Sequence, residues 1–232
     1  MKLLVPAREE RATRRLHQAA YVAGAGVVVF AILAVLVNAR VFAALDLAIA
    51  QSFLAIDLPG LDVASAALAI IFSGELSLVY AGLLAVYFWR RDMRVGVLAV
   101  LAFLPLVFVE IVLKYVVNQP PVPDDLSRAL AYPLANLTTQ GSFPSGHAAR
   151  AAFFAVFLGN LGRSSGGLMR WLAPLVAVLI ALACALSRLY QEVHWASDVV
   201  AGAILGAAIG YLAVCWVGVA VERATRHDEA GL

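Results

Sequence analysis

Charged side chains and cysteines are scarce in this chain of 232 residues. Only 14% of the residues are charged, 63% are hydrophobic, and the mean hydropathy is +0.89. A water-soluble domain cannot bury so much apolar surface, so the composition excludes that class and indicates a polytopic membrane protein. The two cysteines, Cys184 and Cys215, both lie inside apolar runs, which argues against a disulfide framework and a cysteine-based metal site.

Histidines and lysines are also rare, and their positions single out one group of residues. Of the four histidines, His17 and His227 lie near the polar ends of the chain, whereas His147 and His194 lie at the borders of apolar runs. One of the two lysines, Lys114, lies inside an apolar run. Ionisable groups in such runs are costly and usually face a cavity or a partner, so these residues are candidates for a functional site.

Repeats, linkers and metal-binding clusters are absent from the sequence. We therefore expect a single membrane domain over residues 1–232. No small-residue cleavage site follows the first apolar run, so we expect no signal peptide. The acidic pair Asp124 and Asp125 fits a solvated loop, and we expect no metal and no cofactor. The net charge of +2 gives no sign of a nucleic-acid partner, and the sequence leaves the oligomeric state open.

Six apolar runs approach or exceed the roughly 20 residues needed to cross a bilayer. They lie at 17–37, 64–89, 95–117, 145–161, 171–186 and 195–219, and the second run is interrupted by Gly74 and Glu75. Residues 41–61, between the first two runs, alternate apolar residues with Asp46, Gln51 and Asp57. This pattern predicts an amphipathic segment in the membrane interface, and the whole pattern predicts an all-α fold with six transmembrane helices.

The basic residues predict how the chain is oriented. With six spans both termini share one side, and that side collects twelve of the seventeen Lys and Arg residues. Because basic residues are enriched in cytoplasmic segments, we expect cytoplasmic ends at 1–16 and 220–232 in the cell membrane. The polar loop 118–143 and the candidate site residues are then expected on the extracytoplasmic side.

The run Pro144-Ser145-Gly146-His147 lies where a loop becomes a predicted helix. The start of a helix offers unpaired N–H groups and a partial positive charge, which suit an anion. Glycine lets the backbone approach a ligand closely, and serine adds a hydroxyl group. A simple helix cap followed by an interfacial histidine is the alternative.

His194 and Asp198 are four residues apart at the start of the last predicted helix and therefore share one face. A carboxylate there can fix the imidazole tautomer and leave the other nitrogen free to attack. Arg188 precedes them, and its planar guanidinium matches phosphate oxygens. A polar interfacial turn and a headgroup-contacting arginine are the alternatives, and a pair with Glu110 is the alternative for Lys114.

Taken together, these motifs resemble the type-2 phosphatidic acid phosphatase superfamily, the integral-membrane lipid phosphate phosphatases. The family pattern has a Lys followed six residues later by Arg-Pro, then Pro-Ser-Gly-His, then Ser-Arg, five residues, His, three residues and Asp. The second part matches at 144–147, and the third matches at Ser187, Arg188, His194 and Asp198. The resemblance covers residues 60–215.

The first motif of the family is incomplete in this chain. Lys114 is present, but Pro121 stands where the family has Arg. Arg150, one turn beyond His147, or Arg128, in the polar loop, are the arginines that could replace it. A structural pair with an intramembrane carboxylate, Glu75 or Glu110, is the alternative for Arg150.

The resemblance implies a metal-free hydrolysis. His194 would attack phosphorus to give a phosphohistidine, Asp198 would orient His194, and His147 would protonate the leaving oxygen and then activate water. The phosphate oxygens would be held by Lys114, Ser145, Gly146 and Arg188, with Arg150 as a further candidate.

A lipid phosphate is the expected substrate, because the site would lie at the membrane surface. An outward-facing site favours a polyprenyl diphosphate, and phosphatidate, phosphatidylglycerophosphate and lipid A phosphates stay open. The competing interpretations are a non-hydrolytic lipid-phosphate binding protein, a phosphotransferase to another lipid, and a transporter. The transporter is disfavoured because the ionisable residues gather at one face instead of following a path across the membrane.

Overall fold

The computed structural model describes residues 4–58, 60–90, 93–128, 141–163 and 166–229. These residues form nine α-helices and no strand, so the predicted all-α fold is confirmed. The helices are α1 (Leu4–Asn38), α2 (Ala43–Leu54), α3 (Leu61–Ile71), α4 (Gly74–Trp89), α5 (Met93–Leu101), α6 (Leu104–Val116), α7 (Gly146–Arg163), α8 (Met169–Tyr190) and α9 (Ala196–Glu229). The predicted loop 118–143 is described only at its two ends, since 129–140 lie outside these ranges.

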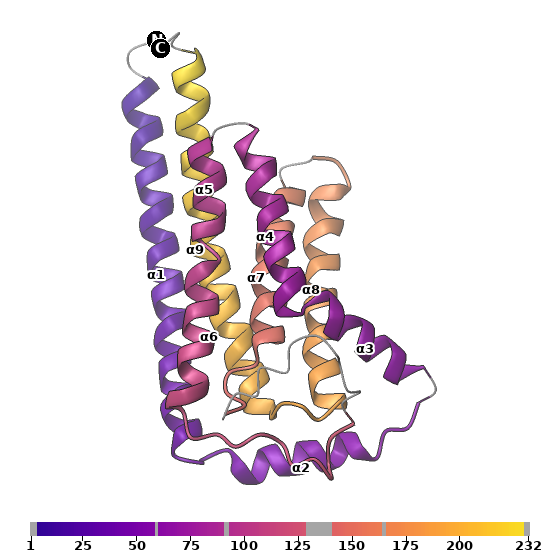
Figure 1. The fold of residues 1–232 in the computed structure, drawn as a ribbon. Helices are drawn as coiled ribbons and strands as arrows, with labels where there is room; N and C mark the ends of the chain where they lie inside the picture. The colour runs from indigo at the N-terminus through magenta and orange to yellow at the C-terminus, as the bar shows by residue number, and fades with distance from the viewer. Residues whose placement is uncertain (1–3, 59, 91–92, 129–140, 164–165, 230–232) are drawn as a thin grey trace.

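The helices form an elongated bundle with one helix lying across its end (Figure 1). In this view α1, α4, α5, α6, α7, α8 and α9 run up and down, whereas α2 lies across the lower end and α3 joins it obliquely to α4. The beginning of α1 and the end of α9 lie together at the upper end. The beginning of α1 and the end of α9 are therefore far from α2.

The outer surface of the bundle is apolar, as expected of helices that face lipid. The large apolar side chains that are more than half exposed include Tyr21, Val28 and Val35 on α1, Leu83 on α4, and Leu175, Leu179 and Leu182 on α8. Three helical stretches are long and apolar enough to span a membrane, namely Thr13–Asn38, Met169–Tyr190 and Ala196–Glu222. The bent pair α3 and α4 makes a fourth, and the full set of six spans stays a prediction.

The second apolar run is broken where the sequence predicts an interruption. α3 ends at Ile71 and α4 begins at Gly74, and the two helices are bent by 51°. Ser73 caps α4, because its hydroxyl accepts a hydrogen bond from the N–H of Leu76 at 3.2 Å. The break leaves the carbonyl of Phe72 at the end of α3 available to a neighbouring helix.

The third apolar run departs from the prediction of one continuous helix over 95–117. α5 ends at Leu101 and α6 begins at Leu104, with Pro105 in its first turn. Proline has no N–H to donate to the carbonyl four residues earlier, and its ring crowds that carbonyl. The break therefore follows from Pro105, which the apolar run concealed.

The helix α2 lies in the segment predicted to be interfacial, but its polar and apolar sides are reversed relative to a simple amphipathic helix. Asp46 is buried, whereas its neighbours Leu45 and Leu47 are exposed. α2 contacts α8 and α9. The carboxylate therefore faces the protein, and the two leucines lie on the outer surface.

The helix α7 lies at the centre of the bundle and packs against both α8 and α9, while α1 packs against α9. The contact of α7 with α9 is close because of three glycines spaced four residues apart on α9. A Cβ atom at Gly202, Gly206 or Gly210 would meet the α7-side backbone of Ser145, Ala149 or Phe153, respectively. Small residues at this spacing allow two membrane helices to approach through their backbones.

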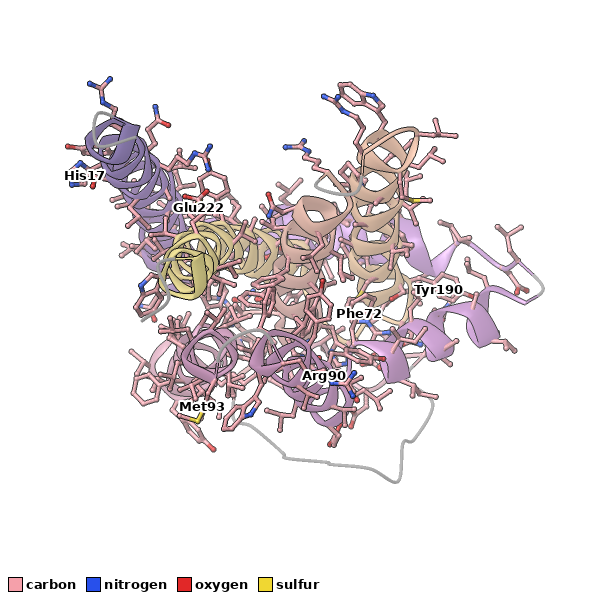
Figure 2. All side chains as sticks on the ribbon, turned by 90° about the horizontal axis from the view of Figure 1, so that it is seen from above. His17, Phe72, Arg90, Met93, Tyr190 and Glu222 are labelled. Carbon is pink, nitrogen blue, oxygen red and sulfur yellow. The ribbon has the colours of Figure 1, made fainter. Side chains whose placement is uncertain are left out.

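At the other end of the bundle α1 and α9 are joined by an ion pair. Arg15 Nη1 lies 2.9 Å from Glu222 Oε1, and both side chains are largely exposed. Figure 2 looks along the bundle from this end and shows Glu222 on α9 and His17 on the neighbouring helix α1. An exposed pair of this kind contributes at most about 1 kcal/mol, so the apolar contact between the helices dominates their packing.

Candidate active site

The residues singled out from the sequence lie at the lower end of the bundle. α6 and α8 end there, and α7 and α9 begin there, next to the crossing helix α2 (Figure 1). Lys114 is in the last turn of α6, His147 in the first turn of α7, Arg188 in the last turn of α8 and Asp198 in the first turn of α9. Four separate helix ends thus contribute to one site.

The pair of His194 and Asp198 is fixed by the start of α9. Asp198 is fully buried, and its Oδ2 accepts the N–H of Trp195 at 3.0 Å, as in the reciprocal capping of a helix start. The same Oδ2 lies 3.5 Å from Nδ1 of His194. This distance exceeds an ordinary hydrogen bond of about 2.9 Å, as often in catalytic pairs without a bound substrate. Nε2 is the ring nitrogen on the side away from this carboxylate.

The surroundings of His194 favour its neutral form. Burial lowers the pKa of His194 well below its usual value, and the positive charges of Lys114, Arg188 and Arg150 lower that pKa further. A backbone hydrogen bond at Ser142 acts in the opposite direction. A neutral imidazole among cations is suited to attack an anion that the cations hold.

The start of α7 brings an unsatisfied hydroxyl group into the site. The N–H of Ser145 donates to the carbonyl of Asp198 at 3.0 Å, which joins the beginnings of α7 and α9. Ser145 Oγ is buried and has no hydrogen-bond partner among the described residues. A buried hydroxyl group without a partner is uncommon, so a ligand oxygen is a natural partner for it.

Gly146 and His147 follow directly. A Cβ atom at position 146 would overlap the carboxylate of Glu110, so a larger residue there requires that carboxylate to move. His147 is held near α3, where the backbone of Ala69 is within hydrogen-bonding reach of the imidazole. His147 and His194 are also close enough to influence each other electrostatically.

Arg188 is buried and fixed from two sides. Its Nη2 donates to the carbonyl of Ser65 at 3.1 Å, and its Nε donates to Ser187 Oγ at 3.3 Å. Ser187 Oγ donates in turn to the carbonyl of Cys184 at 2.7 Å. These contacts hold the guanidinium in one orientation, which suits a residue that positions phosphate oxygens.

Lys114 lies within electrostatic reach of the carboxylates of Glu110 and Asp198. Its ammonium makes no ion pair with any described residue, and Glu110, the predicted alternative partner, pairs elsewhere. The Nη1 of Arg150 lies 2.6 Å from Oε2 of Glu110. A half-buried cation without a direct ion pair supports a role in binding an anion.

Arg150 therefore has the structural pairing that the sequence left open as an alternative. Its Nε also donates to the carbonyl of Phe72 at 3.1 Å, at the break between α3 and α4. Arg150 thus connects α7 to α6 and to this break, and it still contributes positive potential at His194. Arg150 therefore acts on His194 through its charge and not through a direct hydrogen bond.

Arg128, the other arginine considered as a replacement at Pro121, belongs to a different cluster. Its guanidinium donates to the carbonyls of Ile56, at 2.6 Å, and Leu54, and it lies over the Tyr190 ring at 4.9 Å. A cavity of about 490 Å³ lies beside this cluster. The cavity is lined by Leu54, Asp57, Asp62, Ser65, Arg128, Tyr190 and Gln191. Ser65, which lines this cavity, accepts a hydrogen bond from Arg188 through its carbonyl, so the cavity lies next to Arg188.

A sequence profile of the PAP2 superfamily matches residues 95–222, more than half of the chain. The chain belongs to the PAP2 superfamily. The matched segment contains Lys114 and the motifs at 144–147 and 187–198, and it ends in α9.

A relative of known name is similar to this chain in sequence. This PAP2 chain is 33% identical over 126 residues to an undecaprenyl-diphosphatase of Sulfolobus acidocaldarius, and the match covers 54% of this chain and 57% of that relative. The chain thus matches less than two thirds of the relative's length.

Two solved structures share the fold. One is a transmembrane PAP2-type phosphatidylglycerolphosphate phosphatase from Bacillus subtilis, with a TM-score of 0.69, 24% identity, and coverage of 83% of this chain and 94% of that one. The other is LpxE from Aquifex aeolicus, with a TM-score of 0.53, 24% identity, and coverage of 73% and 94%. These likenesses establish the membrane-protein fold.

Two buried acidic residues of the site region were not predicted from the sequence. Asp46 on α2 was interpreted as the polar side of an interfacial helix, but its carboxylate faces α9. Glu192 lies two residues before His194 with a φ of 52° and with no hydrogen-bond partner for its carboxylate among the described residues. Burial raises the pKa of Glu192, and the charge of Arg128 opposes this effect. No local pattern marks either residue, because both depend on contacts distant in sequence.

Proposed function

We propose that this PAP2 protein is a metal-independent phosphatase that hydrolyses a lipid phosphate or diphosphate through a phosphohistidine intermediate. One observation carries the proposal: the His194–Asp198 pair is buried among the charges of Lys114, Arg188 and Arg150. A purely structural histidine has no need of three cations, whereas a nucleophile that attacks a phosphate anion does.

The proposed reaction has two steps. Nε2 of His194 attacks phosphorus, an N–P bond forms, and the P–O bond to the lipid breaks while His147 gives a proton to the leaving oxygen. A water molecule then gives its proton to His147 and attacks phosphorus, which breaks the N–P bond and releases inorganic phosphate. Asp198 stabilises the positive imidazole in the first step.

The non-bridging phosphate oxygens have several donors available. Lys114 supplies a free cation, Ser145 a buried hydroxyl group without a partner, and Gly146 an N–H at the start of α7. Arg188 supplies a guanidinium fixed by Ser187 and Ser65. Donors fixed before the reaction stabilise the charge of the transition state more effectively than donors that must reorganise.

The proposed substrate is a polyprenyl diphosphate or a phosphatidate-type lipid. The apolar outer surface of the bundle allows the lipid tail to stay in the bilayer while its phosphate reaches the helix ends. The name of the Sulfolobus relative, undecaprenyl-diphosphatase, favours the polyprenyl diphosphate.

We further propose that the protein lies in the cell membrane with both termini in the cytoplasm and the site on the extracytoplasmic side. The excess of Lys and Arg on the side of the termini supports this orientation. The structure adds that the start of α1 and the end of α9 lie at the opposite end of the bundle from the site (Figure 1).

Phosphate release in detergent tests the proposal most directly. A panel of polyprenyl diphosphate, phosphatidate, phosphatidylglycerophosphate and lipid A phosphate is assayed with EDTA present. We expect wild type to release phosphate, and His194→Ala to lose the activity by a factor of about 10³ or more. His17→Ala, at an exposed histidine far from the site, is the matched control and should retain full activity. Loss of wild-type activity in EDTA, or normal turnover by His194→Ala, contradicts the mechanism.

A non-hydrolytic lipid-phosphate binding protein is the second candidate, because Pro121 leaves one phosphate-binding arginine missing. Arg128 and Arg150, its possible replacements, make their hydrogen bonds elsewhere. Tight binding of a labelled lipid phosphate by folded wild-type protein, without release of phosphate or transfer to an added acceptor lipid, identifies this case. Transfer to the acceptor instead identifies a phosphotransferase.

A further inference from the structure

The carboxylate of Asp46 is buried against the start of α9. Asp46 is only 3% exposed, although α2 lies across the end of the bundle. Its Oδ1 accepts the N–H of Ser197 at 2.9 Å, and its Oδ2 accepts the hydroxyl of Ser197 at 2.7 Å. Burial and the nearby charge of Asp198 raise the pKa of Asp46, and the hydrogen bonds from Ser197 lower it. Burying a carboxylate costs free energy, so the hydrogen bonds from Ser197 must offset that cost.

A second residue reinforces this contact. Gln119 Nε2 lies 3.5 Å both from Oδ2 of Asp46 and from Oγ of Ser197. The carbonyl of Gln119 accepts the N–H of Ser142 at 3.0 Å, just before the Pro144-Ser145-Gly146-His147 turn. Asp46 therefore belongs to a polar cluster that connects α2, the segment after α6, the segment before α7 and the start of α9.

Ser197 connects this polar cluster to Asp198. Ser197 lies immediately before Asp198, and the first turn of α9 is held at two points. Asp46 binds the N–H of Ser197, and Asp198 binds the N–H of Trp195. The Asp198 carboxylate is already 3.5 Å from the His194 imidazole. The position of this turn therefore decides whether the carboxylate can close on the imidazole or moves farther from it.

We propose that Asp46 is a positioning residue, which holds the first turn of α9 so that Asp198 stays directed at His194. Through Asp46 the crossing helix α2 becomes part of the proposed catalytic arrangement, in which Asp46 acts through Asp198 and not on the substrate. This inference deepens the proposed hydrolase function and rests on it.

Steady-state kinetics with Asp46→Asn test the inference. Asparagine keeps the shape of the side chain but accepts only one of the two hydrogen bonds well, so kcat should fall about tenfold, as misplacement of a catalytic group does. The KM should change less than twofold, because Lys114, Ser145 and Arg188 are untouched. Asp57→Asn, an exposed carboxylate just beyond the end of α2, is the control and should leave kcat unchanged.

A double-mutant cycle separates positioning from general stability. If Asp46 acts through Asp198, then Asp46→Asn should lower kcat less than twofold when Asp198→Asn is already present. Ser197→Ala, which removes one donor to Asp46, should reproduce part of the loss in the wild-type background. Equal tenfold losses in both backgrounds, or an unchanged kcat in Asp46→Asn, overturn the inference.

The reactivity of His194 gives a readout that does not depend on turnover. Diethyl pyrocarbonate modifies neutral imidazoles, and the rate at His194 can be followed by peptide mass spectrometry. We expect this rate to fall several-fold in Asp46→Asn, because a displaced Asp198 no longer orients the imidazole or stabilises its positive form, and to stay constant in Asp57→Asn. An unchanged rate in both variants overturns the inference. Absence of phosphate release by wild type counts against the proposed function, whereas an unaffected Asp46→Asn counts against the positioning role.

Discussion

At the scale of single residues, the protonation of His194 is the property on which the proposed chemistry depends most. Burial and three neighbouring cations act on it in the same direction and lower its pKa. The imidazole is therefore neutral at neutral pH and becomes protonated only when the pH falls through this lowered pKa. Because the protonated form cannot attack phosphorus, the acid limb of kcat/KM should lie below the ordinary histidine value of about 6.5.

Replacing Lys114 should move this acid limb. Lys114→Gln removes the first of the neighbouring charges that lower the pKa of His194, so the pKa rises and activity is lost at a higher pH than in wild type. The measurement is the pH profile of kcat/KM. Because the substitution also weakens phosphate binding and lowers the whole profile, the pH at the midpoint of the acid limb is compared and not the height of the profile. Arg170→Gln, at the far end of α8, removes an equal charge as a control and should leave the midpoint in place. A wild-type midpoint at or above 6.5 contradicts the electrostatic argument.

The proposed catalytic residues could be singled out from the sequence, whereas the residue proposed to position them could not. His147, His194 and Asp198 stand out because ionisable groups are rare in apolar runs and their spacing places two of them on one helix face. Asp46 has the same polar signature as any residue of an interfacial helix. Its role depends on Ser197, which is 151 residues away.

At the scale of helices, the close contact of α7 and α9 fixes the distance between the two ends that carry His147 and Asp198. The contact is made by glycines on α9, and at Gly206 a Cβ atom would overlap the backbone of Ala149. A larger residue at this position is therefore unfavourable, because overpacking a well-packed interior costs about 1–3 kcal/mol.

Gly206→Ala should therefore destabilise the protein, although alanine is the better helix former by about 1 kcal/mol. The expected result is a lower thermal midpoint in detergent and a reduced kcat, because α7 and α9 are forced apart. Gly218→Ala is a matched control on the same helix, since a Cβ atom there meets nothing within 4 Å. That substitution should leave the midpoint unchanged or raise it, and an equal response of the two variants contradicts the packing argument.

Helix positions were predicted well where hydrophobic runs are bounded by polar residues, and poorly where they are not. The break between α3 and α4 was predicted from Gly74 and Glu75. The break between α5 and α6 was not, because residues on both sides of it are apolar and only Pro105 marks it.

At the scale of the whole molecule, the ends of the chain and the site lie at opposite ends of the bundle (Figure 1). If the basic residues orient the protein as proposed, the site end is accessible from outside the cell and the other end is not.

Cysteine labelling in cells checks this orientation. In a variant with Cys184 and Cys215 replaced by alanine, we expect Asp57→Cys, exposed at the site end, to react with a membrane-impermeant maleimide in intact cells. Thr13→Cys, exposed on α1 at the other end, should react only after the membrane is permeabilised. The reverse pattern contradicts an extracytoplasmic site.

The ion pair of Arg150 with Glu110 has a consequence for how the protein reaches the membrane. α7 is the helix most enclosed by its neighbours, and its arginine on its own opposes transfer into lipid by up to about 3.5 kcal/mol. Glu110 precedes Arg150 by 40 residues, so the ribosome delivers the carboxylate first. The carboxylate of Glu110 on α6 is thus present before Arg150 is made. As a result, α7 can be inserted against α6 and need not enter the bilayer as an isolated charged helix.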